Sequence, residues 1–238
     1  TKALLKNAEL YHDMKDRAAE FGFAFNGLNF DWSKIVKRSR VVSEKGSAGV
    51  DFLFKKNKID PLRGEASLDK PGEVKVRSAD GKEETHSAKY ILIATGCESR
   101  PLPGLPFDGK RVIGSKEAVA LEQRPSSIVI IGAGAIGIEF AYIFNAFGTK
   151  VTVVEMLPNI LPIEDTEVSQ ALEKSFSKQG IQLLTNHKTT KTEASDQGVK
   201  ITVADSKGSE KTVDAEIALV AIGVAPVFPG GSVKIGLD

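Results

Sequence analysis

Three glycines, Gly132, Gly134 and Gly137, have the GxGxxG spacing of a phosphate-binding turn. An apolar run, rich in β-branched residues, occupies 128–131, and apolar residues follow at helical spacing over 136–147. The pattern predicts a strand, a glycine turn and a helix. In that arrangement Gly132 permits the tight turn, Gly134 lets a pyrophosphate approach the backbone, and Gly137 lets the helix lie close to the strand.

The predicted helix begins at Ala135 and Ile136, whose free N–H groups and helix dipole would face an anion. A second apolar strand is predicted over 150–154, and it ends at Glu155. A carboxylate at this point accepts hydrogen bonds from both ribose hydroxyls and repels a 2′-phosphate. No arginine follows in the next residues, 156–158, so the sequence favours NAD over NADP. The alternative is a βαβ unit that binds no nucleotide.

Charge gives no indication of a polyanionic partner. The 238 residues include 32 Lys and Arg against 31 Asp and Glu, a net charge of +1, with the two signs interleaved. Nucleic acid and anionic membrane are therefore not expected as partners. No apolar run is long enough to span a bilayer and no signal-peptide pattern opens the chain, so a cytoplasmic protein, or a matrix protein in a mitochondrion, is expected.

The chain holds one cysteine, Cys97, which excludes an internal disulfide and a cysteine-ligated cluster. Cys97 is expected to be a buried small hydrophobe and not a reactive thiol. The three histidines, His12, His86 and His187, have no metal-ligand spacing, and no metal site is predicted.

Periodicity predicts the remaining elements. Helices are expected from residue 2, from the N-cap candidate Asp31 and over 164–179. Gly46 and Gly49 are expected to interrupt or bend the second of these. Period-two patterns predict an antiparallel meander over 59–87 and another over 189–213. Fully apolar strands are predicted over 90–94 and 216–222.

The two apolar strands predicted over 90–94 and 216–222 are each followed by a glycine, Gly96 or Gly223. This similarity suggests that a dinucleotide-binding architecture occurs twice in the chain. The expected fold is α/β, with two Rossmann-like dinucleotide-binding domains, each carrying an antiparallel meander. A Pro- and Gly-rich segment places a boundary near Val112. We expect a partial FAD-binding domain over 1–112, an NAD-binding domain over 113–222, and a return toward the first domain over 223–238.

Several motifs resemble, in order and spacing, the pyridine nucleotide–disulfide oxidoreductases over nearly the whole chain. The motifs are the opening Thr-Lys-Ala-Leu-Leu at 1–5, Ala-Thr-Gly at 94–96, the fingerprint with its trailing glutamate at 132–139, and the stretch 155–162. The last of these is more similar to the lipoamide-oxidising branch than to the NADP-linked glutathione branch.

The resemblance implies two cofactors, FAD and NAD, and roles for particular residues. Lys2 would form an ion pair with Glu139 beside the flavin and the nicotinamide. Thr95 and Gly96 would approach FAD, and Ala66 would contact its adenine through the backbone. For NAD, Lys188 and Gly223 are weaker candidates.

The resemblance further implies that the chain is the central part of a longer enzyme. The cysteine pair would precede Thr1, and a His–Glu base would follow Asp238. The whole enzyme would oxidise a dithiol, dihydrolipoamide on a lipoyl-bearing protein of a 2-oxo acid dehydrogenase complex, and would be a homodimer. Two alternatives remain open here: a sibling such as mercuric or glutathione reductase, and a non-catalytic NAD-sensing module. A bound flavin would separate the enzymes from the sensor.

Overall fold

The computed structural model describes residues 1–227, and 228–238 lie outside the described residues. The chain divides into two compact units, the first formed by Thr1–Ser43 and Ser99–Val224, the second by Glu44–Glu98 and Ala225–Asp238. The predicted return segment, 223–238, therefore falls mostly outside the described part. No helix within 1–227 is both long and apolar enough to cross a bilayer.

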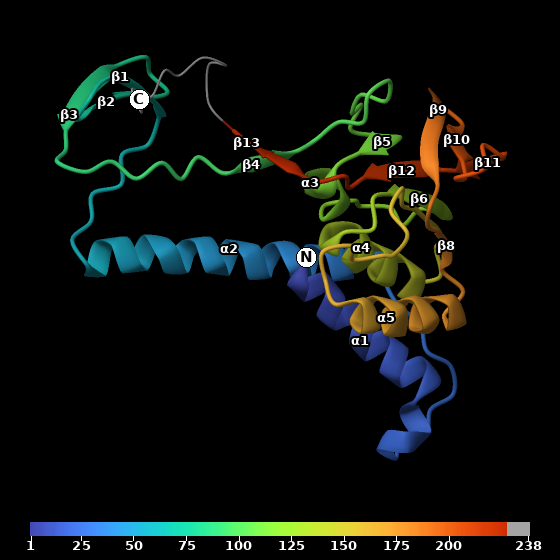
Figure 1. The fold of residues 1–238 in the computed structure, drawn as a ribbon. Helices are drawn as coiled ribbons and strands as arrows, with labels where there is room; N and C mark the ends of the chain where they lie inside the picture. The colour runs from blue at the N-terminus through green and yellow to red at the C-terminus, as the bar shows by residue number, and fades with distance from the viewer. Residues whose placement is uncertain (228–238) are drawn as a thin grey trace. The chain divides into compact units, whose positions relative to one another are not determined.

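The first unit is built on a five-stranded parallel sheet (Figure 1). The strand order is β5-β12-β6-β7-β8. The strands are β5 (Val112–Ile113), β6 (Ser127–Ile131), β7 (Lys150–Val154), β8 (Gln182–Leu184) and β12 (Ile217–Val220). The residues predicted to bind a nucleotide follow the ends of β6, β7, β8 and β12, so the sheet sets their positions.

Helices cover one face of this sheet and a meander covers the other (Figure 1). The elements of the helical side are α1 (Lys2–Asp16), η1 (Ala18–Phe21), α3 (Ser115–Ala118), α4 (Ala135–Ala146) and α5 (Thr166–Lys178). The meander consists of β9 (Lys188–Ser195), β10 (Gly198–Ala204) and β11 (Glu210–Ala215), all antiparallel. The predicted strand–turn–helix–strand over 128–154 and the meander over 189–213 are thus confirmed.

Alternation along the strands divides the core into two layers. On β6, Ile128 and Ile130 pack toward the helices, whereas Val129 and Ile131 pack toward the meander. All four side chains are buried, as expected for a parallel sheet covered on both faces.

Aromatic side chains fill the helical layer. Phe144 and Phe147 lie near the end of α4, and the Trp32 ring centroid lies 5.7 Å from that of Phe144. Tyr11 of α1 stacks on Phe147 at 5.2 Å. The Trp32 indole N–H also donates to the Leu121 carbonyl at 2.8 Å, which satisfies its buried polar atom.

The helix α2 (Trp32–Lys56) is continuous, so the expected interruption at Gly46 and Gly49 is wrong. A glycine inside a helix costs about 1 kcal/mol relative to alanine but keeps its backbone hydrogen bonds. Asp31 acts as expected at the start, because its carboxylate accepts from the Lys34 N–H at 3.1 Å. The first part of the helix, up to Ser43, belongs to the first unit, and the remainder belongs to the second.

The second unit contains an antiparallel meander, as predicted, although its first strand begins later than expected. Its strands are β1 (Glu65–Lys70), β2 (Glu73–Arg77) and β3 (Glu83–Ser87), and a short sheet of β4 (Cys97–Ser99) and β13 (Val224–Pro226) lies at its boundary.

The predicted buried strand over 90–94 is not observed. These residues form no strand, and Tyr90 and Leu92 are 82% and 91% exposed. A buried strand needs neighbouring strands to hydrogen-bond its backbone, and no described strand pairs with this segment. Cys97, expected to be buried, is exposed on β4.

The aromatic layer gives a stability prediction. We expect Phe144→Ala to lower the free energy of unfolding by about 3–5 kcal/mol, because Phe144 is fully buried and its removal leaves a cavity. Phe23→Ala is the matched control, since Phe23 is 53% exposed and its loss should change stability by about 0.5 kcal/mol or less. Chemical denaturation measures both, and equal losses would contradict the assignment of Phe144 to the core.

Candidate nucleotide-binding site

The glycine turn at 132–137 connects β6 to α4 and is fixed by backbone hydrogen bonds. The Gly132 N–H donates to the Val154 carbonyl at 2.8 Å, and the Leu161 N–H donates to the Ala133 carbonyl at 2.8 Å. The Ala221 N–H, after β12, donates to the Ile131 carbonyl at 2.7 Å. The turn is therefore held by the strands on both sides of β6.

Glycine is required at two positions of this turn for different reasons. Gly132 has φ of 103°, and a β-carbon there would lie 2.5 Å from the Ala221 carbonyl oxygen. A β-carbon on Gly137 would collide with the Gly132 carbonyl oxygen, so a larger residue would push α4 away from the strand. Both roles agree with the sequence prediction.

Gly134 differs from the other two, because a β-carbon at this position would meet nothing within 4 Å. It precedes the first residue of α4 and has no side chain to cap the helix. The N–H groups of the first helical turn therefore face open space. This is the arrangement in which a helix N-terminus binds a phosphate group.

Glu155 lies beside this turn, directly after β7, and is 8% exposed. One carboxylate oxygen accepts from the Ala133 N–H at 2.8 Å, and the other accepts from the Leu157 N–H at 2.9 Å. These bonds give both carboxylate oxygens a partner and fix the orientation of the group. Each oxygen keeps a further lone pair with which it can accept from a hydroxyl group.

The backbone of Glu155 extends this connection to the next strand. Its N–H donates to the Leu184 carbonyl at the end of β8, and its carbonyl accepts from the His187 N–H, both at 2.9 Å. Glu155 thus ties the ends of β7 and β8 to the turn after β6. Carboxyl ends of parallel strands are where ligands bind in doubly wound sheets.

A cleft of about 570 Å³ opens at these strand ends, within the size range of small-molecule sites. Of the residues predicted from the sequence to bind the nucleotide, Gly132, Gly134, Ala135, Ile136, Glu155, Lys188 and Gly223 line it. Gly137 does not line it, in agreement with its packing role.

Sequence reasoning missed other parts of the wall. Met156 and Leu157 follow Glu155, and His187 and Thr189 flank the predicted Lys188; all four line the cleft. The position of these residues just after β7 and β8 could have identified them, since parallel strands end at one edge. Leu102 also lines the cleft but has no local signal, because it comes from a Pro- and Gly-rich segment distant in sequence.

The ion pair that the family resemblance implied is present. The Lys2 ammonium donates to a carboxylate oxygen of Glu139, joining the first turn of α1 to α4. Lys2 is 82% exposed at its side chain and Glu139 only 27%, so the carboxylate is the better fixed partner. An exposed pair of this kind contributes little to stability.

The residues predicted to approach a flavin belong to the second unit. Gly96 has φ of 81°, a conformation that favours glycine, and its carbonyl accepts from the Val227 N–H at 3.0 Å. Thr95 is exposed beside it, and Ala66 lies on β1. Their contacts with a flavin stay predictions.

Comparison with known proteins identifies the family. The family model described as pyridine nucleotide-disulphide oxidoreductase matches residues 1–237. The chain is 42% identical, over its whole length, to a dihydrolipoyl dehydrogenase of Chlorobaculum parvum and covers 50% of that protein. It is 33% identical over its whole length to the mitochondrial dihydrolipoyl dehydrogenase of Pisum sativum, of which it covers 48%.

A solved structure shares the fold. The crystal structure of LpdA from Mycobacterium tuberculosis superposes with a TM-score of 0.87 at 26% identity, covering 99% of this chain and 50% of the other. The chain therefore spans about half the length of the curated relatives it matches.

The contrast between two glycines is testable. We expect Gly132→Ala to destabilise the fold by more than about 1 kcal/mol, because of its positive φ and the Ala221 carbonyl. Gly134→Ala should leave stability within about 1 kcal/mol but weaken NADH binding at least about tenfold, since its methyl group projects toward the phosphate position. Thermal unfolding and NADH fluorescence titration measure these effects. Normal NADH affinity in Gly134→Ala would contradict the placement of the phosphates.

Proposed function

The chain belongs to the pyridine nucleotide-disulphide oxidoreductases, and from this membership we propose that it is the central part of an FAD-dependent, NAD-linked dihydrolipoyl dehydrogenase. The observation that carries the proposal is the buried Glu155 carboxylate held beside an open glycine turn. The names of the relatives over the whole length of the chain support the same activity.

In this proposal the cleft holds the adenosine diphosphate half of NAD. The N–H groups of Ala135 and Ile136 bind the pyrophosphate, and Glu155 accepts hydrogen bonds from the ribose hydroxyls. Lys188 and Gly223 contribute to the walls. Because two backbone amides orient the Glu155 carboxylate, it cannot swing away from a 2′-phosphate, which supports a preference for NAD over NADP.

FAD would be bound through Thr95, Gly96 and the backbone of Ala66. When bound, the two cofactors supply two-electron redox chemistry, taking electrons from a dithiol by way of a cysteine pair and delivering them to NAD. Lys2 places a positive charge that would favour a reduced, anionic flavin, and Glu139 holds the lysine in position. The redox cysteines and a His–Glu base would come from outside this chain.

The substrate and partners follow from the same proposal. The dithiol is dihydrolipoamide carried by a lipoyl-bearing protein of a 2-oxo acid dehydrogenase complex, and the complete protein is a homodimer. The proposed domains are a partial FAD-binding domain over 1–112, an NAD-binding domain over 113–222 and a returning segment over 223–238. The proposed compartment is the cytoplasm, or the mitochondrial matrix for a eukaryotic protein.

Cofactor preference tests the role of Glu155. We expect the double substitution Glu155→Ala with Met156→Arg to weaken NAD binding at least about tenfold and to improve NADP binding, because the carboxylate is lost and an arginine can reach the phosphate. Met156 suits the added arginine, since it is 65% exposed and lines the cleft.

Glu167→Ala is the control, because this glutamate lies on the first turn of α5, outside the cleft lining. Calorimetric titration with both nucleotides gives the ratio of affinities. An unchanged ratio in the double variant would refute the ribose assignment.

The flavin potential tests the role of Lys2. In protein with a complete FAD site, we expect Lys2→Met to lower the reduction potential, because the reduced, anionic flavin loses a nearby positive charge. Lys6→Met is the matched control, since Lys6 lies one turn later on α1 and pairs with Glu9 at 3.0 Å. Potentiometric titration of the flavin absorbance measures both. Equal potentials in the two variants would leave Lys2 as an ordinary helix-start residue.

A further inference from the structure

A second cleft, of about 270 Å³, opens between the parallel sheet and β11. Its walls include Ser127, Lys150 and Gln182, which are the first residues of β6, β7 and β8. The nucleotide cleft lies at the carboxyl ends of the sheet. The two clefts are therefore at opposite ends of the same strands.

The side chains facing the meander change character along these strands. At the carboxyl ends Ile131, Val154 and Leu184 are buried against the meander. At the amino ends the same face presents Lys150 and Gln182 together with Thr152 and Ser127. The apolar layer between sheet and meander thus gives way to a polar space at this end.

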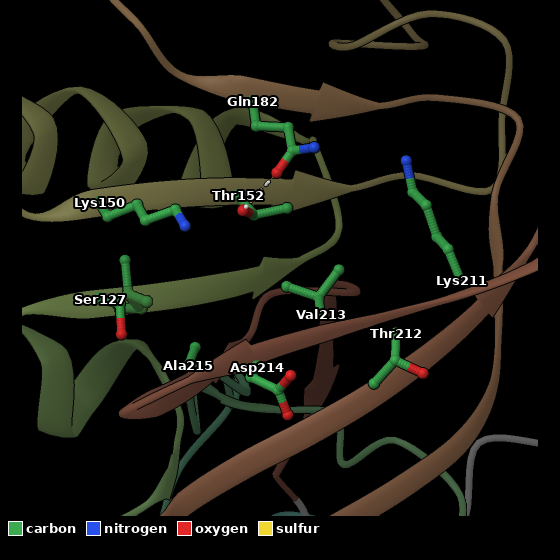
Figure 2. Close-up of a pocket in the computed structure, with 10 residues that line it drawn as sticks. Ser127, Lys150, Thr152, Gln182, Lys211, Thr212, Val213, Asp214 and Ala215 are labelled. Carbon is green, nitrogen blue, oxygen red and sulfur yellow. Dashed lines mark hydrogen bonds between the residues drawn. The ribbon is translucent and has the colours of Figure 1, made fainter.

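Lysines reach into this space from both walls (Figure 2). Lys150 comes from the start of β7 and Lys211 from β11, with Val213 pointing toward the sheet between them. Within residues 1–227 neither ammonium has a carboxylate partner within 4.0 Å, in contrast to lysines such as Lys191, which pairs with Glu193 at 2.5 Å. Two cations are thus available to a ligand.

Other groups add donors and an apolar floor. The Gln182 side-chain oxygen accepts from the Thr152 hydroxyl at 3.0 Å, which directs its NH2 group to the cleft. Val213 supplies apolar surface. Asp214, the one carboxylate in the wall, lies 3.9 Å from the Lys200 ammonium on the neighbouring strand, which offsets its charge.

We propose that this cleft binds a small organic dianion, with its anionic ends at Lys150 and Lys211 and its carbon chain over Val213. The inference is independent of the proposed enzyme activity. A volume of about 270 Å³ lies just below the range of drug-sized sites, which fits a short dicarboxylate. Two charge-assisted contacts from opposite walls favour a dianion over a single carboxylate.

Calorimetric titration of the chain with succinate tests this proposal, with butyrate as the matched monoanion and constant ionic strength. We expect saturable succinate binding that is at least about tenfold weaker in Lys150→Gln and in Lys211→Gln, because each loses one charged contact. Lys174→Gln, on an exposed position of α5, is the control and should bind normally. Saturating NAD should leave succinate affinity unchanged.

Several results would overturn the site. They are succinate binding no tighter than butyrate binding, equal affinity in all three lysine variants, and displacement of succinate by NAD, which would place the anion in the nucleotide cleft. An absence of saturable binding would likewise refute it. Far-ultraviolet circular dichroism of each variant verifies that the fold is intact, so that a loss of affinity reports on the cleft.

Discussion

The carboxylate of Glu155 is the group on which the proposed nucleotide cleft depends. A nearly buried charge is stable only when polar groups replace the water that it loses, and here the N–H groups of Ala133 and Leu157 do so. Through its backbone the same residue is joined to Leu184 and His187. The side chain and the backbone of this one residue therefore bring three consecutive strand ends into a fixed arrangement.

The sheet explains why polar chemistry gathers at its two edges. Its middle is buried on both faces, by helices on one side and by the meander on the other, and holds mainly apolar side chains. The buried Thr152 is a polar exception, and its hydroxyl donates to the Gln182 side chain. Most other polar residues and the glycines lie at the first residues of the strands or just beyond their ends. At the carboxyl edge these positions carry the turn and Glu155, and at the amino edge they carry Lys150 and Gln182.

Sequence patterns predicted the parts of this structure that rest on local constraints. Gly132 and Gly137 could be assigned from spacing, because each is required by a close backbone contact within the turn or at the neighbouring strand. The course of 90–94 could not be predicted, since an apolar run forms a strand only when neighbours pair with it. The role of Gly46 inside α2 was misjudged because propensity is a weak preference that a long helix can override.

The residues that line the cleft also divide into those that a sequence motif identifies and those that only the tertiary fold brings there. Lys188 was identified from the resemblance, whereas Leu102 joins the cleft through the path of a segment that belongs to no named helix or strand. Contacts made by such segments depend on the tertiary fold and leave no periodic signal. The Lys2–Glu139 pair joins residues distant in sequence, and only the family motif brought them together in advance.

The collision between a Gly137 β-carbon and the Gly132 carbonyl has an evolutionary consequence. Gly132 and Gly137 can hardly vary, because a side chain at either position would displace backbone. Positions after β7 and β8, such as Met156 and His187, already carry large side chains and are not restricted to glycine. Substitutions at these outer positions can therefore alter the lining of the cleft while the glycine turn keeps its backbone geometry, so that the two parts of the proposed site can evolve at different rates.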